Sequence, residues 1–414
     1  MKEQISDNLN NPNELEKLYR NNKSLFKTEF NKLYPTLEDK PVAQFWNERL
    51  NFDTPSISWG KSGELVFVIV ASLLAGFLAK LPDFIGINEE FYYSRNIAFI
   101  ILPILIVYFS WKKKLNLRKI GLALGLLVVA FIFINALPNP KSSDTLILSC
   151  IHLPLFLWSI LGFTFTGNNL RDSENRIDFL RYNGDAVVMS TLILIAGIIL
   201  TGLTMLLFSL IDVDIYEFYF EYVVIFGIAA TPIVATYVTQ TNPQLVNKVS
   251  PVIAKIFSPL VLITLVFYLI AIIYTGKDPF NDRDFLIAFN FLLIGVMAIV
   301  VFSIAETSKE TKRNASLVIL FLLSLVTIVI NGIALSAIVF RISEWGITPN
   351  RIAVLGGNIL ILANLLLVSF LLFKTSFRNG SVAEVNGAIA KYLPIYSIWT
   401  IIVTFLFPFI FMFK

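Results

Sequence analysis

Two arginines and one glutamate lie close together in the last quarter of the chain, at Arg341, Glu344 and Arg351. Arg341 and Glu344 are three residues apart, a spacing that allows an ion pair on a helix. Arg351 falls in the first turn of the next predicted helix, where the helix dipole disfavours a cation. We therefore expect a negative partner for Arg351, which could be Glu344, Glu221, a lipid headgroup or a substrate. A structural ion cluster and a site that binds an anionic ligand both remain open.

The residues between the two arginines predict a tight turn that joins two helices. Gly346 can adopt the left-handed conformation that ends a helix. Thr348 can cap the N-terminus of the next helix, and Pro349 suits its first position. The turn alone explains these three residues, whereas it does not explain the arginines.

Two further ionisable side chains lie in apolar segments, where a charge is costly and therefore a candidate for function. His152 could relay protons, hydrogen-bond a ligand, or simply bond a neighbouring helix. Glu221 is the deepest acid of the segment Asp212–Tyr222, whose other acids and aromatic rings suit a helix N-terminus at a membrane interface. Glu221 is thus a candidate site for a cation or a proton. Pro232, in the middle of the same predicted span, predicts a helix kink.

The composition excludes several classes of protein. Of the 414 residues, 56% are hydrophobic and only 15% are charged, which is too apolar for a soluble globule. One His and one Cys cannot build a zinc or haem site with several such ligands, so we expect no metal and no cofactor. The net charge of +4 is small, and we expect no nucleic-acid partner. The chain has no P-loop and no Gly-x-Ser-x-Gly motif, although a transferase that uses a single His or Asp stays open.

The elements that must position these residues are membrane-spanning helices. A span needs about 20 mostly apolar residues, and eleven segments of the chain meet this need. The predicted fold class is all-α, a polytopic helical membrane protein with about eleven transmembrane helices. The predicted spans are Leu65–Leu81, Ile97–Trp111, Ile120–Leu137, Thr145–Phe165, Ala186–Ile211, Phe218–Thr239, Pro251–Tyr274, Asp284–Ala305, Ser316–Phe340, Ile352–Lys374 and Leu393–Phe413.

Lys and Arg are divided unequally between the loops on the two sides of these spans. Sixteen lie in one set of alternating loops and six in the other. Cytoplasmic loops carry the excess of Lys and Arg, so we expect the N-terminus in the cytoplasm. With an odd number of spans, the C-terminus is then expected outside.

Residues 1–63 are polar and mixed in charge, and we separate them from a transmembrane domain at residues 64–414. Asn11-Pro12 predicts a helix start, and Pro35 ends the apolar pattern that follows it. A second short amphipathic piece covers Val42–Leu50. The apolar faces of these helices must be buried against each other, on cytoplasmic loops, on the lipid bilayer or on a partner protein.

The segment Arg341–Arg351 resembles an uncharacterised family of bacterial polytopic membrane proteins, domain of unknown function 4153. In that family an Arg, an acidic-aromatic-Gly turn, a Thr and a second Arg lie between two late spans; the matching residues here are Arg341, Glu344, Trp345, Gly346, Thr348 and Arg351. The segment Ile253–Leu262 resembles the Pro-Leu-rich start of a span in the same family. The resemblance covers most of residues 60–414 and implies a multi-pass protein of the bacterial cytoplasmic (inner) membrane. The family has no settled activity, so the resemblance implies no function.

Two functions from different classes fit the sequence. The first is a transporter or permease for a small anionic or lipid-like ligand, with Arg341, Glu344 and Arg351 at its outer mouth and Glu221 or His152 deeper. The alternative is a non-transporting membrane scaffold or envelope sensor that binds a partner through its N-terminal helices. The sequence leaves the oligomeric state open.

Overall fold

The computed structural model describes residues 1–51, 60–138, 143–169, 172–210, 213–246, 249–275, 280, 283–307 and 315–414. By contact density the chain divides into two compact units, Met1–Ser58 and Trp59–Lys414. Asp212 and several of the loop cations that predict the orientation lie outside the described residues; these cations are Lys141, Arg171, Lys248, Lys277, Lys309, Lys312 and Arg313.

All regular structure in the described ranges is helical, and eleven helical segments are long and apolar enough to cross a membrane. This confirms the predicted all-α, polytopic architecture. The long helices are α5 (Ser62–Ala79), α7 (Glu89–Lys112), α8 (Leu117–Ala136), α9 (Asp144–Phe165), α10 (Ser173–Ser209), α12 (Ile225–Thr241), α14 (Ser250–Thr275), α15 (Arg283–Ala305), α16 (Ala315–Trp345), α17 (Pro349–Phe377) and α18 (Val382–Ile401). Shorter helices between or beside them are α6 (Leu81–Ile85), α11 (Tyr216–Phe218), the π-helix η2 (Tyr219–Val224), α13 (Pro243–Val246), the π-helix η3 (Ile402–Leu406) and α19 (Phe407–Ile410).

Some helices begin well before their apolar stretches. The apolar pattern predicts a span from Ala186, but α10 already begins at Ser173, after an N-cap in which the side chain of Asp172 accepts from the backbone N–H of Glu174. Likewise α18 begins at Val382, capped by Ser381, and not at Leu393. Hydropathy marks only the part of a helix that suits hydrocarbon, whereas capping residues mark where the backbone hydrogen bonds begin.

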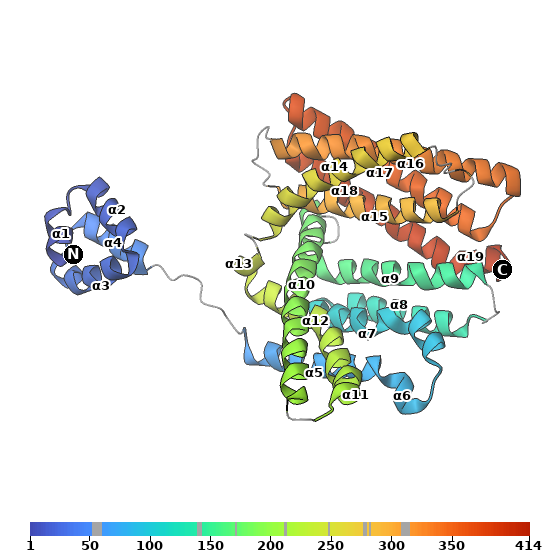
Figure 1. Cartoon of the computed structure of the whole chain (residues 1–414), viewed down its shortest axis with the longest axis horizontal. Coiled ribbons are helices and arrows are strands. Elements are labelled where there is room, and N and C mark those ends of the chain that lie inside the picture. Colours follow the sequence, from blue (N-terminus) through green and yellow to red (C-terminus); the bar gives the residue numbers. More distant parts are fainter. Residues whose placement is uncertain are drawn as a thin grey trace. The chain divides into compact units, whose positions relative to one another are not determined.

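Two groups of helices in the larger unit pack around separate apolar cores. The first core includes Phe109 and Leu157 and joins α5, α7, α8, α9 and α12. The second includes Phe289 and Leu323 and joins α14 to α18. In Figure 1, α9 lies between the blue-to-green helices of the first group and the orange-to-red helices of the second. Residues of α10 belong to both cores, so α10 connects the two groups.

The unit Met1–Ser58 contains α1 (Lys2–Asp7), α2 (Pro12–Asn21), α3 (Lys23–Leu33), the short 3-10 helix η1 (Tyr34–Thr36) and α4 (Pro41–Asn51). As the sequence indicates, α2 begins at Pro12 with the Asn11 side chain accepting from Glu14 N–H. The apolar faces of these helices pack against each other around Phe26, Phe30 and Trp46, all fully or almost fully buried. Most of the apolar surface that needed a partner is therefore covered within the unit itself.

We predict that Phe26→Ala unfolds the unit Met1–Ser58. The Phe26 ring is completely buried and lies 5.1 Å, centroid to centroid, from the ring of Trp46. Removing a buried Phe side chain costs about 3–5 kcal/mol, which is comparable to the whole stability of a unit of this size. Hydrogen exchange of the α2–α4 amides in the full chain, followed by mass spectrometry, measures the effect.

The matched control is the neighbouring Leu25→Ala, because the Leu25 side chain is 44% exposed. Its effect is expected to stay within about 0.5 kcal/mol. Equal protection of the amides in both variants would contradict the described core.

Candidate functional site

The turn between α16 and α17 has the local geometry that its residues predict. Gly346 has a left-handed φ of +77° directly after the last residue of α16. The Thr348 side chain accepts from the backbone N–H of Arg351 at 3.3 Å, and Pro349 is the first residue of α17. This turn brings the Arg351 side chain back toward the end of α16.

The partner of Arg351 is the backbone of α16. Its Nη1 atom donates to the carbonyl oxygens of Trp345 at 2.7 Å and Gly346 at 2.6 Å. Arg341 Nε donates to the Phe280 carbonyl at 2.9 Å, and the guanidinium groups of both arginines lie over the Trp345 ring. The unpaired carbonyls at a helix C-terminus carry partial negative charge, which supplies the negative partner that Arg351 requires.

Glu344 is exposed beside this turn. In the described part of the chain, no ion pair joins it to Arg341 or Arg351. The structure therefore brings Arg341 and Arg351 together around Trp345 and leaves Glu344 out of their hydrogen bonds. A ligand-contacting role for these three residues stays a prediction.

Glu221 lies in the π-helix η2 and has a cation nearby. Its carboxylate is 3.9 Å from Lys80 Nζ, which also forms an ion pair with Asp83 and lies over the Tyr222 ring. The Lys80 side chain is almost completely buried, and its hydrogen bond to Asp83 raises the pKa of the ammonium above its ordinary value. In the sequence, Lys80 follows an apolar run. No local pattern there indicates that it pairs with a residue on a distant helix.

The remaining predicted residues lie apart from these groups. His152 Nδ1 is 2.9 Å from the carbonyl oxygen of Leu148, one turn earlier on α9, so its hydrogen bond stays within its own helix. Pro232 lies inside α12, where the hydroxyl of Thr236 donates to the Pro232 carbonyl. The proposed proton or ligand role of His152 and the kink at Pro232 stay predictions.

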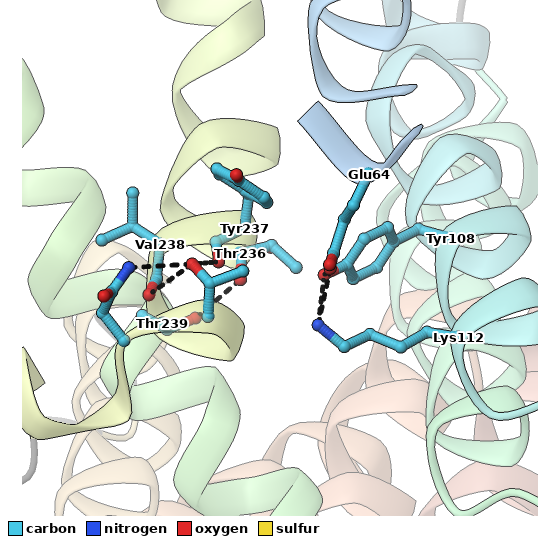
Figure 2. Close-up of polar contacts among 9 residues, drawn as sticks. Glu64, Tyr108, Lys112, Thr236, Tyr237, Val238 and Thr239 are labelled. Carbon is cyan, nitrogen blue, oxygen red and sulfur yellow. Dashed lines mark hydrogen bonds and ion pairs between the residues drawn. The ribbon is translucent and has the colours of Figure 1, made fainter. Parts of the chain in front are cut away.

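One polar cluster that the sequence did not reveal joins α5 to α7. Tyr108 Oη and Lys112 Nζ both donate to the same oxygen of Glu64, each at 2.6 Å, and Lys112 Nζ also lies 2.9 Å from Tyr108 Oη. Figure 2 shows the Glu64 and Lys112 side chains pointing toward each other between the two helices. The Glu64 and Lys112 side chains are only 12% and 27% exposed, so the pair is substantially desolvated.

The last turns of α12 lie opposite this cluster in Figure 2, with Thr236, Tyr237 and Thr239. Gly60, just before α5, lies close both to Glu64 of this cluster and to Tyr237 of α12. A Cβ atom at Gly60 would lie 3.2 Å from Tyr237 Oη and 3.4 Å from a Glu64 carboxylate oxygen, and the glycine has a positive φ of +63°. The positive φ at this position favours glycine, and a Cβ atom would also crowd its neighbours on both sides.

A second polar cluster joins α10 to the end of α15. Arg181 donates to Asp178 at 2.8 Å and to the carbonyl oxygen of Ala305 at 2.6 Å, and its Nε is 3.4 Å from Glu306 Oε1. One helical turn further along α10, Asp185 accepts from the Ser250 hydroxyl at 2.5 Å. Burial, together with the nearby Asp185 carboxylate, raises the pKa of the Glu306 carboxyl to about 7, and Arg181 opposes this shift.

Glu306 also lines a pocket of about 230 Å³ where α14 begins, α15 ends and α16 begins. Its polar lining is contributed by Lys255, Ser258, Ser303, Glu306, Thr307 and Ser316, and its apolar lining residues include Pro259, Ile319 and Leu320. A pocket with both kinds of lining suits a molecule with a polar head and an apolar part. Among the described residues, no group of three or more His, Cys, Asp or Glu side chains is arranged to hold a metal ion.

Comparisons of the chain with protein-family models, with curated proteins and with solved structures find no match.

We predict strong energetic coupling between Glu64 and Lys112. Glu64→Ala alone should cost about 3–5 kcal/mol, because it leaves the Lys112 ammonium in the bundle without its carboxylate. The double variant with Lys112→Ala should cost about 2–3 kcal/mol less than the sum of the single variants. Reversible unfolding of the full chain in mixed micelles measures this double-mutant cycle.

The control is the pair Lys374 and Glu384, whose atoms are 2.9 Å apart but whose side chains are 44% and 47% exposed. Its coupling energy is expected to stay below about 1 kcal/mol. Similar coupling energies for the two pairs would show that burial does not strengthen the Glu64–Lys112 interaction.

Proposed function

We propose that the protein is a permease of the bacterial cytoplasmic membrane for a small anionic or lipid-like ligand, which enters through the pocket between α14, α15 and α16. The observation that carries this proposal is the pocket's mixed lining, which combines Lys255 and several hydroxyl groups with apolar side chains. The eleven long apolar helices, which fit an integral membrane protein, supply the surroundings that a permease needs.

Lys255 is the residue best placed to attract an anion. Its side chain is exposed, and within the residues that the structure describes it has no ion pair. A positive charge with no ion-pair partner among the described carboxylates remains available to a phosphate, sulfate or carboxylate group of a ligand. Lys255 belongs to the loop set rich in Lys and Arg, so we place the pocket, like the N-terminus, on the cytoplasmic side.

This proposal includes membership of the uncharacterised bacterial family that the Arg341–Arg351 segment resembles. However, the proposal places the main ligand contact at Lys255 in the pocket and not in the Arg341–Arg351 segment. The Arg351 guanidinium already donates to the carbonyls of Trp345, the last residue of α16, and of Gly346 in the turn, which supports a role in holding the turn. The predicted outer mouth at Arg341, Glu344 and Arg351 is then the opposite end of the path.

The alternative, a scaffold or sensor that acts through the N-terminal unit, has one observation in its favour. A groove of about 370 Å³ on this unit is lined by Val42, Phe45 and Trp46, with the ion pair of Glu16 and Arg49 beside it. Phe45 is 63% exposed there and could contact an apolar partner segment. Deleting residues 1–55 should abolish the function of a scaffold and largely spare that of a permease.

We predict that proteoliposomes containing the protein take up radiolabelled octanesulfonate, an anion with an apolar tail, faster than protein-free liposomes. Lys255→Gln should reduce the initial rate by about tenfold or more, because a hydrogen bond to a charged group contributes about 1.5–3 kcal/mol. Lys391→Gln, at an exposed lysine that does not line the pocket, is the matched control and should leave the rate unchanged. Uptake no faster than in protein-free liposomes would refute the permease function.

A further inference from the structure

Glu306 combines burial with an incomplete set of hydrogen bonds at the wall of the pocket. Its side chain is only 6% exposed, and it lines the pocket directly after the last residue of α15. Its Oε1 atom accepts no hydrogen bond among the described groups, although Arg181 Nε lies 3.4 Å away. A buried carboxylate oxygen in this situation is costly, and a proton or a ligand donor would lower that cost.

In the part of the chain that the structure describes, the charges around Glu306 do not balance. On α10, the single guanidinium of Arg181 is shared between Asp178 and Glu306, and Asp185 adds a third carboxylate that is bonded to Ser250. On α14 the charged residue lining the pocket is Lys255, and α16 contributes only Ser316 and apolar side chains to the lining. Among the described groups, these three carboxylates outnumber the two cations, Arg181 and Lys255, which favours the protonation of one carboxylate.

The hydrogens of most hydroxyl groups in the pocket are already in use. Ser258 donates to the Ala254 carbonyl, and Thr307 donates to the Ser303 carbonyl. Ser303 Oγ is 2.9 Å from Ser258 Oγ, so with the Ser258 hydrogen committed, Ser303 is the donor of that bond. Among the described side chains that line the pocket, the donors left for an anion are Lys255, Ser316 and, only when it carries a proton, the carboxylic acid of Glu306.

Resting on the proposed function, we propose that an anion binds in this pocket together with one proton, which Glu306 takes up from solution and holds. The carboxylate gains the proton and becomes a neutral acid, and its O–H then donates to an oxygen of the anion. No other bond forms or breaks. Protonation removes the negative charge that would repel the anion, and it supplies a donor that the hydroxyl groups cannot supply.

The thermodynamic consequence has a definite sign. Burial holds the pKa of Glu306 at about 7, so the carboxyl is ionised in alkaline solution and protonated in acidic solution. An anion that binds next to it raises its pKa further, and by linkage the anion then binds more tightly as the pH falls. A cation in the same pocket would show the opposite dependence.

The test measures octanesulfonate binding by calorimetry to the full chain in nanodiscs, with empty nanodiscs as the blank. Octanesulfonate stays anionic throughout, so any pH dependence belongs to the protein. Between about pH 6 and about pH 8.5 the affinity should fall by about sevenfold if the anion raises the pKa of Glu306 by one unit, and by about twentyfold if it raises it by two. Titrations at about pH 8 in two buffers of different ionisation enthalpy should show net proton uptake, of about 0.4 proton for each anion bound if the anion raises the pKa of Glu306 by one unit and about 0.8 if it raises it by two.

Glu306→Gln preserves the size and hydrogen-bonding capacity of the side chain but cannot titrate. This variant should still bind octanesulfonate, with an affinity independent of pH and with no proton uptake. Glu384→Gln, at an exposed carboxyl outside the pocket, should behave like the wild type. A parallel titration with inorganic sulfate identifies the source of the anionic group: proton-linked binding of sulfate indicates a small free anion, and proton-linked binding of octanesulfonate alone indicates a lipid-like molecule.

Wild-type affinity that is independent of pH, or that rises with pH, would overturn the inference, as would failure of both anions to bind. One outcome would support the permease function and refute the role of Glu306. In that outcome proteoliposomes take up octanesulfonate and Lys255→Gln abolishes the uptake, but binding shows no proton linkage. If binding is proton-linked but no uptake occurs, the pocket and Glu306 stand and the permease function falls.

Discussion

The end of every helix in an apolar environment leaves backbone carbonyls without partners, and this protein satisfies several of them with arginine. Arg95 is the clearest case: the residue is only 2% exposed, and its Nη1 atom donates to the carbonyls of Ile134 and Leu137, where α8 ends. Arg351 does the same at the end of α16, and Arg181 at the end of α15. A guanidinium has five donors in a fixed plane, so it can bond two acceptors at once and return positive charge to the negative end of the helix dipole. The contacts of Arg351 hold the turn between α16 and α17, and the contact of Arg181 holds the end of α15, where the pocket lies.

The clusters around Glu64 and Glu306 differ in how completely hydrogen-bond donors and cations neutralise the carboxylate. Glu64 receives hydrogen bonds from both Tyr108 and Lys112, and its charge is matched within the cluster. Glu306 has to share Arg181 with Asp178 and with the carbonyl of Ala305. The first arrangement stabilises one packing of α5 against α7. The second leaves a carboxyl group whose protonation state depends on what lies beside it, and it does so at the wall of a pocket.

Features with a local cause could be predicted from the sequence, and features that depend on distant residues could not. Apolar runs predicted the eleven long helices because spanning hydrocarbon is a property of each segment alone, and Gly346, Thr348 and Pro349 predicted their turn because capping is local. Lys80 and Glu221 are 141 positions apart, so no spacing rule could pair them. Arg181, Asp185, Ser250 and Glu306 meet only after three helices, α10, α14 and α15, have packed, and each looks ordinary in its own segment. The partner of Arg351 was missed for another reason: the sequence directs attention to acidic side chains, whereas the partner is backbone.

The length of α10 connects the acidic cluster to the lipid. Its 37 residues make a rod of about 55 Å, whereas the hydrocarbon layer of a bilayer is about 30 Å thick. The most apolar stretch of this helix has no buried residue, and the polar beginning of the helix carries Asp178, Arg181 and Asp185. A long apolar helix adapts to bilayer thickness by changing its tilt. Since α10 is continuous, a change of tilt in its apolar half would also displace the half that carries Asp178, Arg181 and Asp185, and a thinner or thicker bilayer would then act on the groups around Glu306.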